Sequence, residues 1–134
     1  MTETGRIFSI DRFSIHDGPG VRTSVFFQGC SLRCAWCHNP EGWQLSGPAL
    51  RFLKKDCTGC GECERICPNG VHRFINGAHV MDRSRCAGCM ACARACPADA
   101  LRIMGEERRA DEVLEEVLKD RPYYGEEGGV TLSG

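Results

Sequence analysis

Two repeated runs of cysteine constrain this chain more than any other feature of its sequence. Each run has the form Cys-x2-Cys-x2-Cys-x3-Cys-Pro, and the second repeats the first at an offset of 29 residues, from Cys57 to Cys86. A repeat at a fixed offset marks a duplicated structural unit. The eight cysteines of the two runs are Cys57, Cys60, Cys63, Cys67, Cys86, Cys89, Cys92 and Cys96.

The cysteine content favours metal binding over disulfides. The 134 residues contain 11 cysteines, and an odd number excludes a fully paired disulfide framework. The first residues do not form a basic segment leading into an apolar one, so we expect no secretory signal. No apolar run approaches the ~18 residues of a membrane helix. The net charge of −1, without a basic stripe, argues against nucleic acid. We therefore expect a soluble, cytoplasmic protein with no membrane or nucleic-acid partner.

The spacing within each run is that of bacterial two-cluster ferredoxins, in which the fourth cysteine of a run ligates the other cluster. Small residues between the ligands would let backbone N–H groups approach the sulfurs, and Pro68 and Pro97 would turn the chain. Zinc is the alternative, but zinc sites separate their cysteine pairs by longer spacers and need no third cysteine in each run. The predicted [4Fe-4S] ligand sets are Cys57, Cys60, Cys63 and Cys96 for one cluster, and Cys86, Cys89, Cys92 and Cys67 for the other.

A third group contains three cysteines, one fewer than each of the two repeated runs. Cys30, Cys34 and Cys37 offer three thiolates in a short loop, and all other cysteines are already assigned. A [4Fe-4S] cluster bound here would keep one iron without a protein ligand. As with catalytic zinc, three protein ligands and one open position make a reactive site. We therefore predict that this cluster is catalytic and that the other two carry electrons.

The rest of the chain predicts a β–α–β unit interrupted by an insertion. Residues 21–28 are rich in β-branched and aromatic side chains and predict a strand, preceded by a turn at 17–20. Residues 110–120 place Val113, Leu114, Val117 and Leu118 on one side of a core-facing helix. Residues 128–134 predict a second strand. Inside the insertion, residues 73–80 predict a hairpin that turns at Asn76-Gly77.

The loop from Cys30 to Cys37, with Trp36 before its last cysteine, resembles the signature loop of the radical S-adenosylmethionine superfamily. The segments 5–10, 14–22, 26–30, 36–41 and 128–134 resemble those of glycyl-radical-enzyme activating enzymes, such as pyruvate formate-lyase activating enzyme. The two-cluster insert is similar to the subgroup that activates choline, glycerol, hydroxyphenylacetate or sulfonate lyases.

This resemblance implies an α/β fold: the N-terminal part of a partial (β/α) radical S-adenosylmethionine barrel with an inserted ferredoxin-like 2[4Fe-4S] module. The expected domains are 1–50, the start of the barrel with its cluster loop; 51–105, the insert; and 106–134, the continuation of the barrel. Too few residues lie outside the insert for the ~200 that a compact barrel needs. We therefore expect the sequence to be a truncated part of a longer protein.

The resemblance also implies an oxidoreductase. A [4Fe-4S] cluster on Cys30, Cys34 and Cys37 would cleave S-adenosylmethionine reductively, and the 5′-deoxyadenosyl radical would take hydrogen from a glycine of a glycyl radical enzyme. Flavodoxin or a ferredoxin-type protein would supply electrons through the inserted clusters. Trp36, Cys37 and His38 would border the adenine of the cofactor, Gly134 would open the segment that binds its methionine amino group, and Asp17 would contact the glycine loop of the partner.

Two other functions compete with this reading. A ferredoxin-like electron carrier would hold the same clusters without cleaving the cofactor, but it needs neither the Asp17-to-Gly20 turn nor the residues around Trp36. A radical enzyme that acts on a small molecule would share the cysteine loop and differ in the remainder of the barrel.

Overall fold

The computed structural model describes residues 3–134, which divide into two compact units. The first unit contains the residues up to Gly47 together with Gly105–Gly134, and the second is Pro48–Met104. This second unit corresponds to the insert that the sequence analysis expected at residues 51–105. Within residues 3–134, no helix has the length and apolar character needed to cross a membrane.

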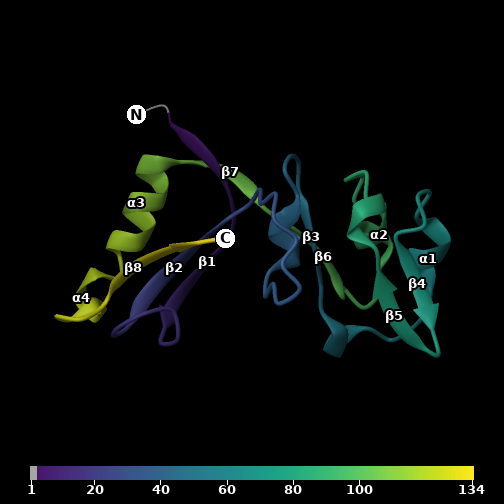
Figure 1. The fold of residues 1–134 in the computed structure, drawn as a ribbon, viewed down its shortest axis with the longest axis horizontal. Coiled ribbons are helices and arrows are strands. Elements are labelled where there is room, and N and C mark those ends of the chain that lie inside the picture. The colour runs from purple at the N-terminus through teal and green to yellow at the C-terminus, as the bar shows by residue number, and fades with distance from the viewer. Residues whose placement is uncertain (1–2) are drawn as a thin grey trace. The chain divides into compact units, whose positions relative to one another are not determined.

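The first unit is built on a four-stranded sheet in the order β7-β1-β2-β8 (Figure 1). β2 and β8 are parallel, whereas β1 is antiparallel to both β2 and β7. Helix α3 connects β7 to α4 and β8, so β2, α3 and β8 form the predicted β–α–β unit. The antiparallel strands β1 and β7 were not predicted. The elements of this unit are β1 (Thr4–Ser14), β2 (Arg22–Phe27), η1 (Pro40–Trp43), β7 (Glu106–Arg109), α3 (Ala110–Leu118), α4 (Arg121–Tyr124) and β8 (Gly129–Ser133).

The core of the first unit lies between the sheet and α3. Ile7, Val25 and Val117 are buried there, and Val113 packs against them. Leu114 and Leu118 are 55% and 47% exposed, so the prediction that all four apolar side chains of this helix face the core is wrong for these two. At 100° per residue, Val113 and Val117 lie only 40° apart, whereas Leu114 and Leu118 lie 100° and 140° around the helix from Val113, so the sheet covers one side of the apolar stripe.

The second unit contains two two-stranded sheets and two short helices. Strand β3 pairs with β6, and β4 pairs with β5, both antiparallel. Its core is formed by Leu50, Met90, Cys92 and Leu101. The elements are β3 (Ala49–Phe52), η2 (Lys54–Asp56), α1 (Glu62–Ile66), β4 (His72–Ile75), β5 (Ala78–Met81), η3 (Arg83–Arg85), α2 (Ala91–Ala95) and β6 (Leu101–Met104).

The duplication seen in the sequence extends to the backbone. The 3-10 turns η2 and η3, and the helices α1 and α2, recur at the 29-residue offset. Positive φ angles recur as well: 77° at Gly61 and 60° at Met90, and 66° at Gly70 and 53° at Asp99. Met90 and Asp99 thus adopt a left-handed conformation that glycine adopts in the other copy.

The predicted hairpin is confirmed. Asn76 and Gly77 have φ angles of 52° and 80°, and they connect β4 to β5. Positive φ at both central residues is the requirement of a type I′ turn, which asparagine followed by glycine meets most readily.

Candidate functional site

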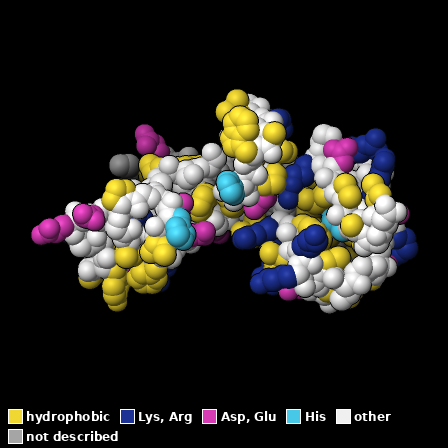
Figure 2. Space-filling model, turned by 60° about the horizontal axis from the view of Figure 1, so that its bottom comes forward, with side chains coloured by type: hydrophobic (Ala, Val, Ile, Leu, Met, Phe, Trp, Pro, Cys, Tyr) yellow, Lys and Arg dark blue, Asp and Glu magenta, His cyan; other side chains and the backbone are white. Residues whose placement is uncertain are grey.

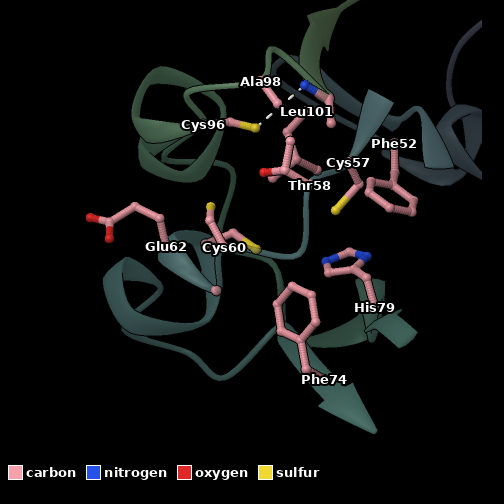
Figure 3. Close-up of a pocket in the computed structure, with 13 residues that line it drawn as sticks. Phe52, Cys57, Thr58, Cys60, Glu62, Phe74, His79, Cys96, Ala98 and Leu101 are labelled. Atoms are coloured by element: carbon pink, nitrogen blue, oxygen red, sulfur yellow. Dashed lines mark hydrogen bonds between the residues drawn. The ribbon is translucent and has the colours of Figure 1, made fainter. Parts of the chain in front are cut away.

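Four cysteines line one pocket of the second unit (Figure 3). They are joined there by apolar and aromatic side chains, including Phe52, Phe74 and Leu101, and by the imidazole of His79. The four cysteines are the same set that the sequence assigns to one cluster: Cys57, Cys60, Cys63 and Cys96.

The other four cysteines of the repeat line a second pocket. Val71, His72 and Met90 contribute to its wall. About 320 Å³ around each set of sulfurs is free of protein atoms, and part of that space is open to solvent. The four cysteines are Cys67, Cys86, Cys89 and Cys92, again the set that the sequence assigns to one cluster.

The two short helices deliver cysteines to both pockets. Cys63 lies in α1 and lines the first pocket, whereas Cys67, which follows this helix, lines the second. Cys92, which lies in α2, lines the second pocket, whereas Cys96, which follows this helix, lines the first. The exchange of fourth cysteines, which the spacing predicts, therefore coincides with the way the two helices separate the pockets.

The spread of the sulfurs distinguishes a cluster from zinc. Tetrahedral zinc with bonds of about 2.3 Å would hold its sulfurs about 3.8 Å apart. Among residues 3–134, the group of metal-ligating atoms that lie within 4.8 Å of one another is Cys63, His72 and His79, and no set of four cysteines is that tight. The pockets therefore fit a larger group with one thiolate at each corner.

Buried thiols such as these ionise only when a positively charged group, such as the core of an iron–sulfur cluster, binds them. Burial raises the pKa of Cys92 to about 11 and raises that of Cys63, so ligation must displace protons from both. The backbone N–H of Ala100 donates to Cys96 Sγ over 3.3 Å, the dashed line of Figure 3. Pro48–Met104 contains nine Lys and Arg against five Asp and Glu, and Figure 2 shows the basic side chains gathered on this unit. This excess offsets the charge of eight thiolates.

The first cysteine group lies in the loop that follows β2. Cys30, Cys34 and Cys37 are all half-exposed free thiols. The N–H groups of Gly29 and Cys30 both donate to the carbonyl of Gly42, over 2.8 and 3.2 Å. These bonds fix the start of the loop against η1. All eight other cysteines line the two pockets of the second unit, so this loop has three thiols and no fourth.

The residues predicted to contact S-adenosylmethionine lie in the loop after β2 and directly after β8. Trp36 is 80% exposed, and His38 is exposed beside it. Gly134 follows β8 so closely against β2 that a Cβ there would lie 2.4 Å from the carbonyl oxygen of Phe27. Because β2 and β8 are parallel, this glycine lies at the end of the sheet from which the cysteine loop departs.

The predicted partner-contact residue, Asp17, is held by the fold. Its carboxylate accepts a hydrogen bond from Ser24 Oγ over 2.7 Å, and its carbonyl accepts one from Thr131 Oγ1 over 2.9 Å. In the same turn, a Cβ on Gly20 would lie 2.6 Å from the backbone nitrogen of Gly128. The segments 14–22 and 128–134, which are far apart in the sequence, therefore lie in contact.

Sequence analysis assigned no role to two histidines that the structure brings together. His72 Nδ1 and His79 Nε2 lie 2.9 Å apart and share a hydrogen bond. Burial lowers the pKa of His72 to about 4, and burial also lowers that of His79. The signal that could have revealed the pair is the Asn76-Gly77 turn, because its register places both residues on one face of the hairpin.

Residues 55–101 match a known family, the 4Fe-4S dicluster domain. Nearly the whole chain is similar to curated activating enzymes. It is 44% identical to choline trimethylamine-lyase activating enzyme of Oleidesulfovibrio alaskensis and 44% identical to indoleacetate decarboxylase activating enzyme of Tractidigestivibacter scatoligenes. It is 46% identical to benzylsuccinate synthase activating enzyme of Thauera aromatica. Each alignment covers 96% of this chain.

The alignments cover 42%, 44% and 40% of these three relatives, so the chain spans about two fifths of their length. A solved chain of the archaeal membrane-bound sulfane sulfur reductase is 24% identical, with a TM-score of 0.38 over 55% of this chain and 45% of that one, too low a likeness to support an inference. Residues 55–101 thus match the 4Fe-4S dicluster domain, and the chain is similar over nearly its whole length to curated activating enzymes.

Proposed function

We propose that the protein activates a glycyl radical enzyme in the cytoplasm by cleaving S-adenosylmethionine reductively. The observation that carries this proposal is the cysteine loop after β2, which holds three thiols and no fourth. An electron carrier has no use for an incompletely ligated cluster, whereas a cofactor-cleaving enzyme requires an iron that its substrate can reach. The relatives at 43–46% identity include activating enzymes for a lyase, a synthase and a dehydratase.

In this proposal, Cys30, Cys34 and Cys37 hold the catalytic cluster. When bound, that cluster supplies the electron that cleaves the cofactor, and the resulting 5′-deoxyadenosyl radical takes a hydrogen atom from a glycine of the partner. The protein's contribution is to fix the start of the loop through the carbonyl of Gly42.

Trp36, Cys37 and His38 would border the adenine of S-adenosylmethionine, and Gly134 would open the segment that binds its amino group. The exposure of Trp36 and the absence of room for a side chain at Gly134 are consistent with these roles. Asp17 would contact the partner's glycine loop through the turn that it occupies, and its bond to Ser24 would keep that turn in place.

The two clusters of the second unit would relay electrons from a flavodoxin or ferredoxin-type donor to the catalytic one. This makes three [4Fe-4S] clusters in total. The first unit would be part of a (β/α) radical S-adenosylmethionine barrel, of which β2, α3 and β8 supply one β–α–β step.

The test is electron paramagnetic resonance of the anaerobically reconstituted, dithionite-reduced protein, with and without S-adenosylmethionine, together with an assay for 5′-deoxyadenosine. We would run this chain and, if the protein is longer, its full length. The Cys34→Ala variant should lose the signal that the cofactor perturbs and should release no 5′-deoxyadenosine. The matched Cys89→Ala variant should keep the perturbed signal. If the cofactor perturbs no signal in the full-length protein, the chain belongs to an electron carrier and the proposal is wrong.

A further inference from the structure

The hairpin of the second unit places two imidazoles side by side. His79 lies opposite Phe74 in the register of β4 and β5, and His72 lies opposite Met81. Residues that are directly opposite share a face of the hairpin, so His72 and His79 are diagonal neighbours on one face. The two rings are 5.1 Å apart between centroids, and the ring of Phe52 lies 4.2 Å from that of His79.

This pair of histidines connects the two cysteine pockets. His79 lines the pocket of Cys57, Cys60, Cys63 and Cys96, as Figure 3 shows. His72 lines the pocket of Cys67, Cys86, Cys89 and Cys92. The hydrogen bond of 2.9 Å between His72 Nδ1 and His79 Nε2 joins one ring to the other.

Each ring has one nitrogen left over. His72 Nε2 and His79 Nδ1 are buried and have no hydrogen-bond partner among the residues that the structure describes. Buried polar atoms nearly always have a partner, so two such atoms beside pockets for iron–sulfur clusters indicate that the clusters supply it. Sulfur atoms of a reduced cluster are acceptors, and hydrogen bonds to them are one of the means by which a protein sets a cluster's potential.

The hydrogen bond between the two rings restricts where their hydrogens can lie. A neutral imidazole carries one N–H, and the neutral form is the one that buried, apolar surroundings favour. If His72 Nδ1 donates to His79 Nε2, then His79 carries its hydrogen on Nδ1 and His72 Nε2 is bare. If the bond runs the other way, His72 carries its hydrogen on Nε2 and His79 Nδ1 is bare. One of the two outer nitrogens is therefore a donor at any moment, and the other is not.

We propose that the His72–His79 pair is a shared hydrogen-bond donor that serves one of the two cluster sites at a time, and so couples their reduction potentials in opposite directions. The inference depends on the binding of [4Fe-4S] clusters in the two pockets and not on S-adenosylmethionine cleavage. A cluster that receives the N–H is easier to reduce, because the donor stabilises the added negative charge. Reduction of one cluster favours the arrangement whose N–H faces it: the outer nitrogen beside that cluster takes up a proton from water, the shared hydrogen crosses the 2.9 Å bond, and the outer nitrogen of the other ring releases a proton to water.

The test is a redox titration of the reconstituted protein, monitored by electron paramagnetic resonance, in the wild type and in the variants His79→Phe and His72→Phe. Phenylalanine keeps the aromatic contacts and removes the hydrogen bonds. Cys60→Ala and Cys89→Ala assign each signal to its pocket. His16→Phe, at an exposed histidine outside the second unit, is the control.

In at least one of the two variants, the potentials of the two clusters should move in opposite directions. The expected size is a tenfold change in the one-electron equilibrium, which is about 59 mV. Neither variant should shift both potentials in the same direction. Shifts in the same direction, or no shift in either variant, would overturn the proposal. If one variant loses iron, the potentials measured in the other variant test the proposal. A wild type without two distinct cluster signals would instead refute the assignment of two clusters to the second unit.

Discussion

Arg12 of β1 donates through Nε to both carboxylate oxygens of Asp120, over 3.0 and 2.8 Å, across a separation of 108 residues. Asp120 is buried, and Thr23 Oγ1 also donates to it over 2.9 Å. The carboxylate thus ties the first strand and the second strand of the sheet to the end of α3. A buried charge of this kind stabilises the fold only while its partners are present.

We expect Asp120→Asn to lower the urea midpoint of unfolding at neutral pH, because the amide cannot accept both bonds from Arg12. The hydrogen bond from Arg12 holds the pKa of Asp120 below its ordinary value of 3.8, so this carboxylate stabilises the folded state above that pH. The contribution is lost as the pH falls through the lowered pKa of the folded state. The difference between wild type and variant should therefore stay constant from neutral pH to about pH 5 and shrink as the pH falls through 3.8 toward the lowered pKa.

Asp99→Asn is the matched control for this prediction, since the Asp99 side chain is 75% exposed and its ion pair with Arg102 spans 3.6 Å. It should leave the midpoint nearly unchanged. If the difference in urea midpoint between the wild type and Asp120→Asn stays constant with pH, the carboxylate stabilises the fold through its shape and not through its charge.

Gly128 can carry no side chain. A Cβ there would lie 2.2 Å from the carbonyl oxygens of both Tyr124 and Val21, two backbone atoms that cannot move independently. We expect Gly128→Ala to destabilise the chain by ~3 kcal/mol in urea unfolding, as forced overpacking does. At Gly5, a Cβ would meet its nearest neighbour at 3.9 Å, so Gly5→Ala should change stability by less than ~0.5 kcal/mol. Equal effects of the two substitutions would contradict this account.

The exchange of fourth cysteines can be tested by spectroscopy. Cys96 belongs to the second run but lines the pocket of the first three cysteines of the first run. The Cys96→Ala variant should therefore lose the same cluster signal as Cys60→Ala, with roughly four iron atoms fewer per chain than the wild type. Cys67→Ala should match Cys89→Ala. Loss of the Cys89 signal in Cys96→Ala would show that each run binds its own cluster.

The two copies of the repeat offer a comparison of backbone strain. Gly70 and Asp99 occupy equivalent positions with φ angles of 66° and 53°. Gly70→Ala should cost ~1 kcal/mol in the free energy of unfolding, because alanine is strained in this region. Asp99→Gly should change it by less than ~0.5 kcal/mol, because aspartate tolerates the left-handed conformation and glycine loses more entropy on folding. A neutral Gly70→Ala would show that the turn can relax.

The sequence predicts those parts of the fold that depend on local chemistry. The strand before Cys30 is visible in its β-branched and aromatic residues, and the hairpin is visible in Asn76-Gly77, whose conformational preference is intrinsic. The helix over Ala110–Leu118 follows from the spacing of its valines and leucines. The partition of eight cysteines between two pockets follows the repeat, because equal spacing imposes equal loops and helices on both copies.

Several features that depend on long-range pairing were not predicted. Strand β7 consists of Glu106, Glu107, Arg108 and Arg109, and it has no apolar residue to reveal it. It is a strand because β1 offers it an unpaired edge. Such charged residues suit the edge of a sheet, where they discourage further pairing. The bond between Arg12 and Asp120, and the meeting of His72 with His79, likewise depend on how the chain returns to itself.

The pairing of β3 with β6 has a consequence for how such a chain could arise. Ala49 lies opposite Met104 in that ladder, so the second unit begins and ends at adjacent backbone positions. The entropy of closing a loop depends on the distance between its ends, and here the unit closes its own ends by hydrogen bonds. The second unit contains more than fifty residues, but it separates the flanking segments of the chain no further than a short loop would. An ancestor could have gained this unit, or a descendant could lose it, with little change in the sheet that surrounds the insertion point.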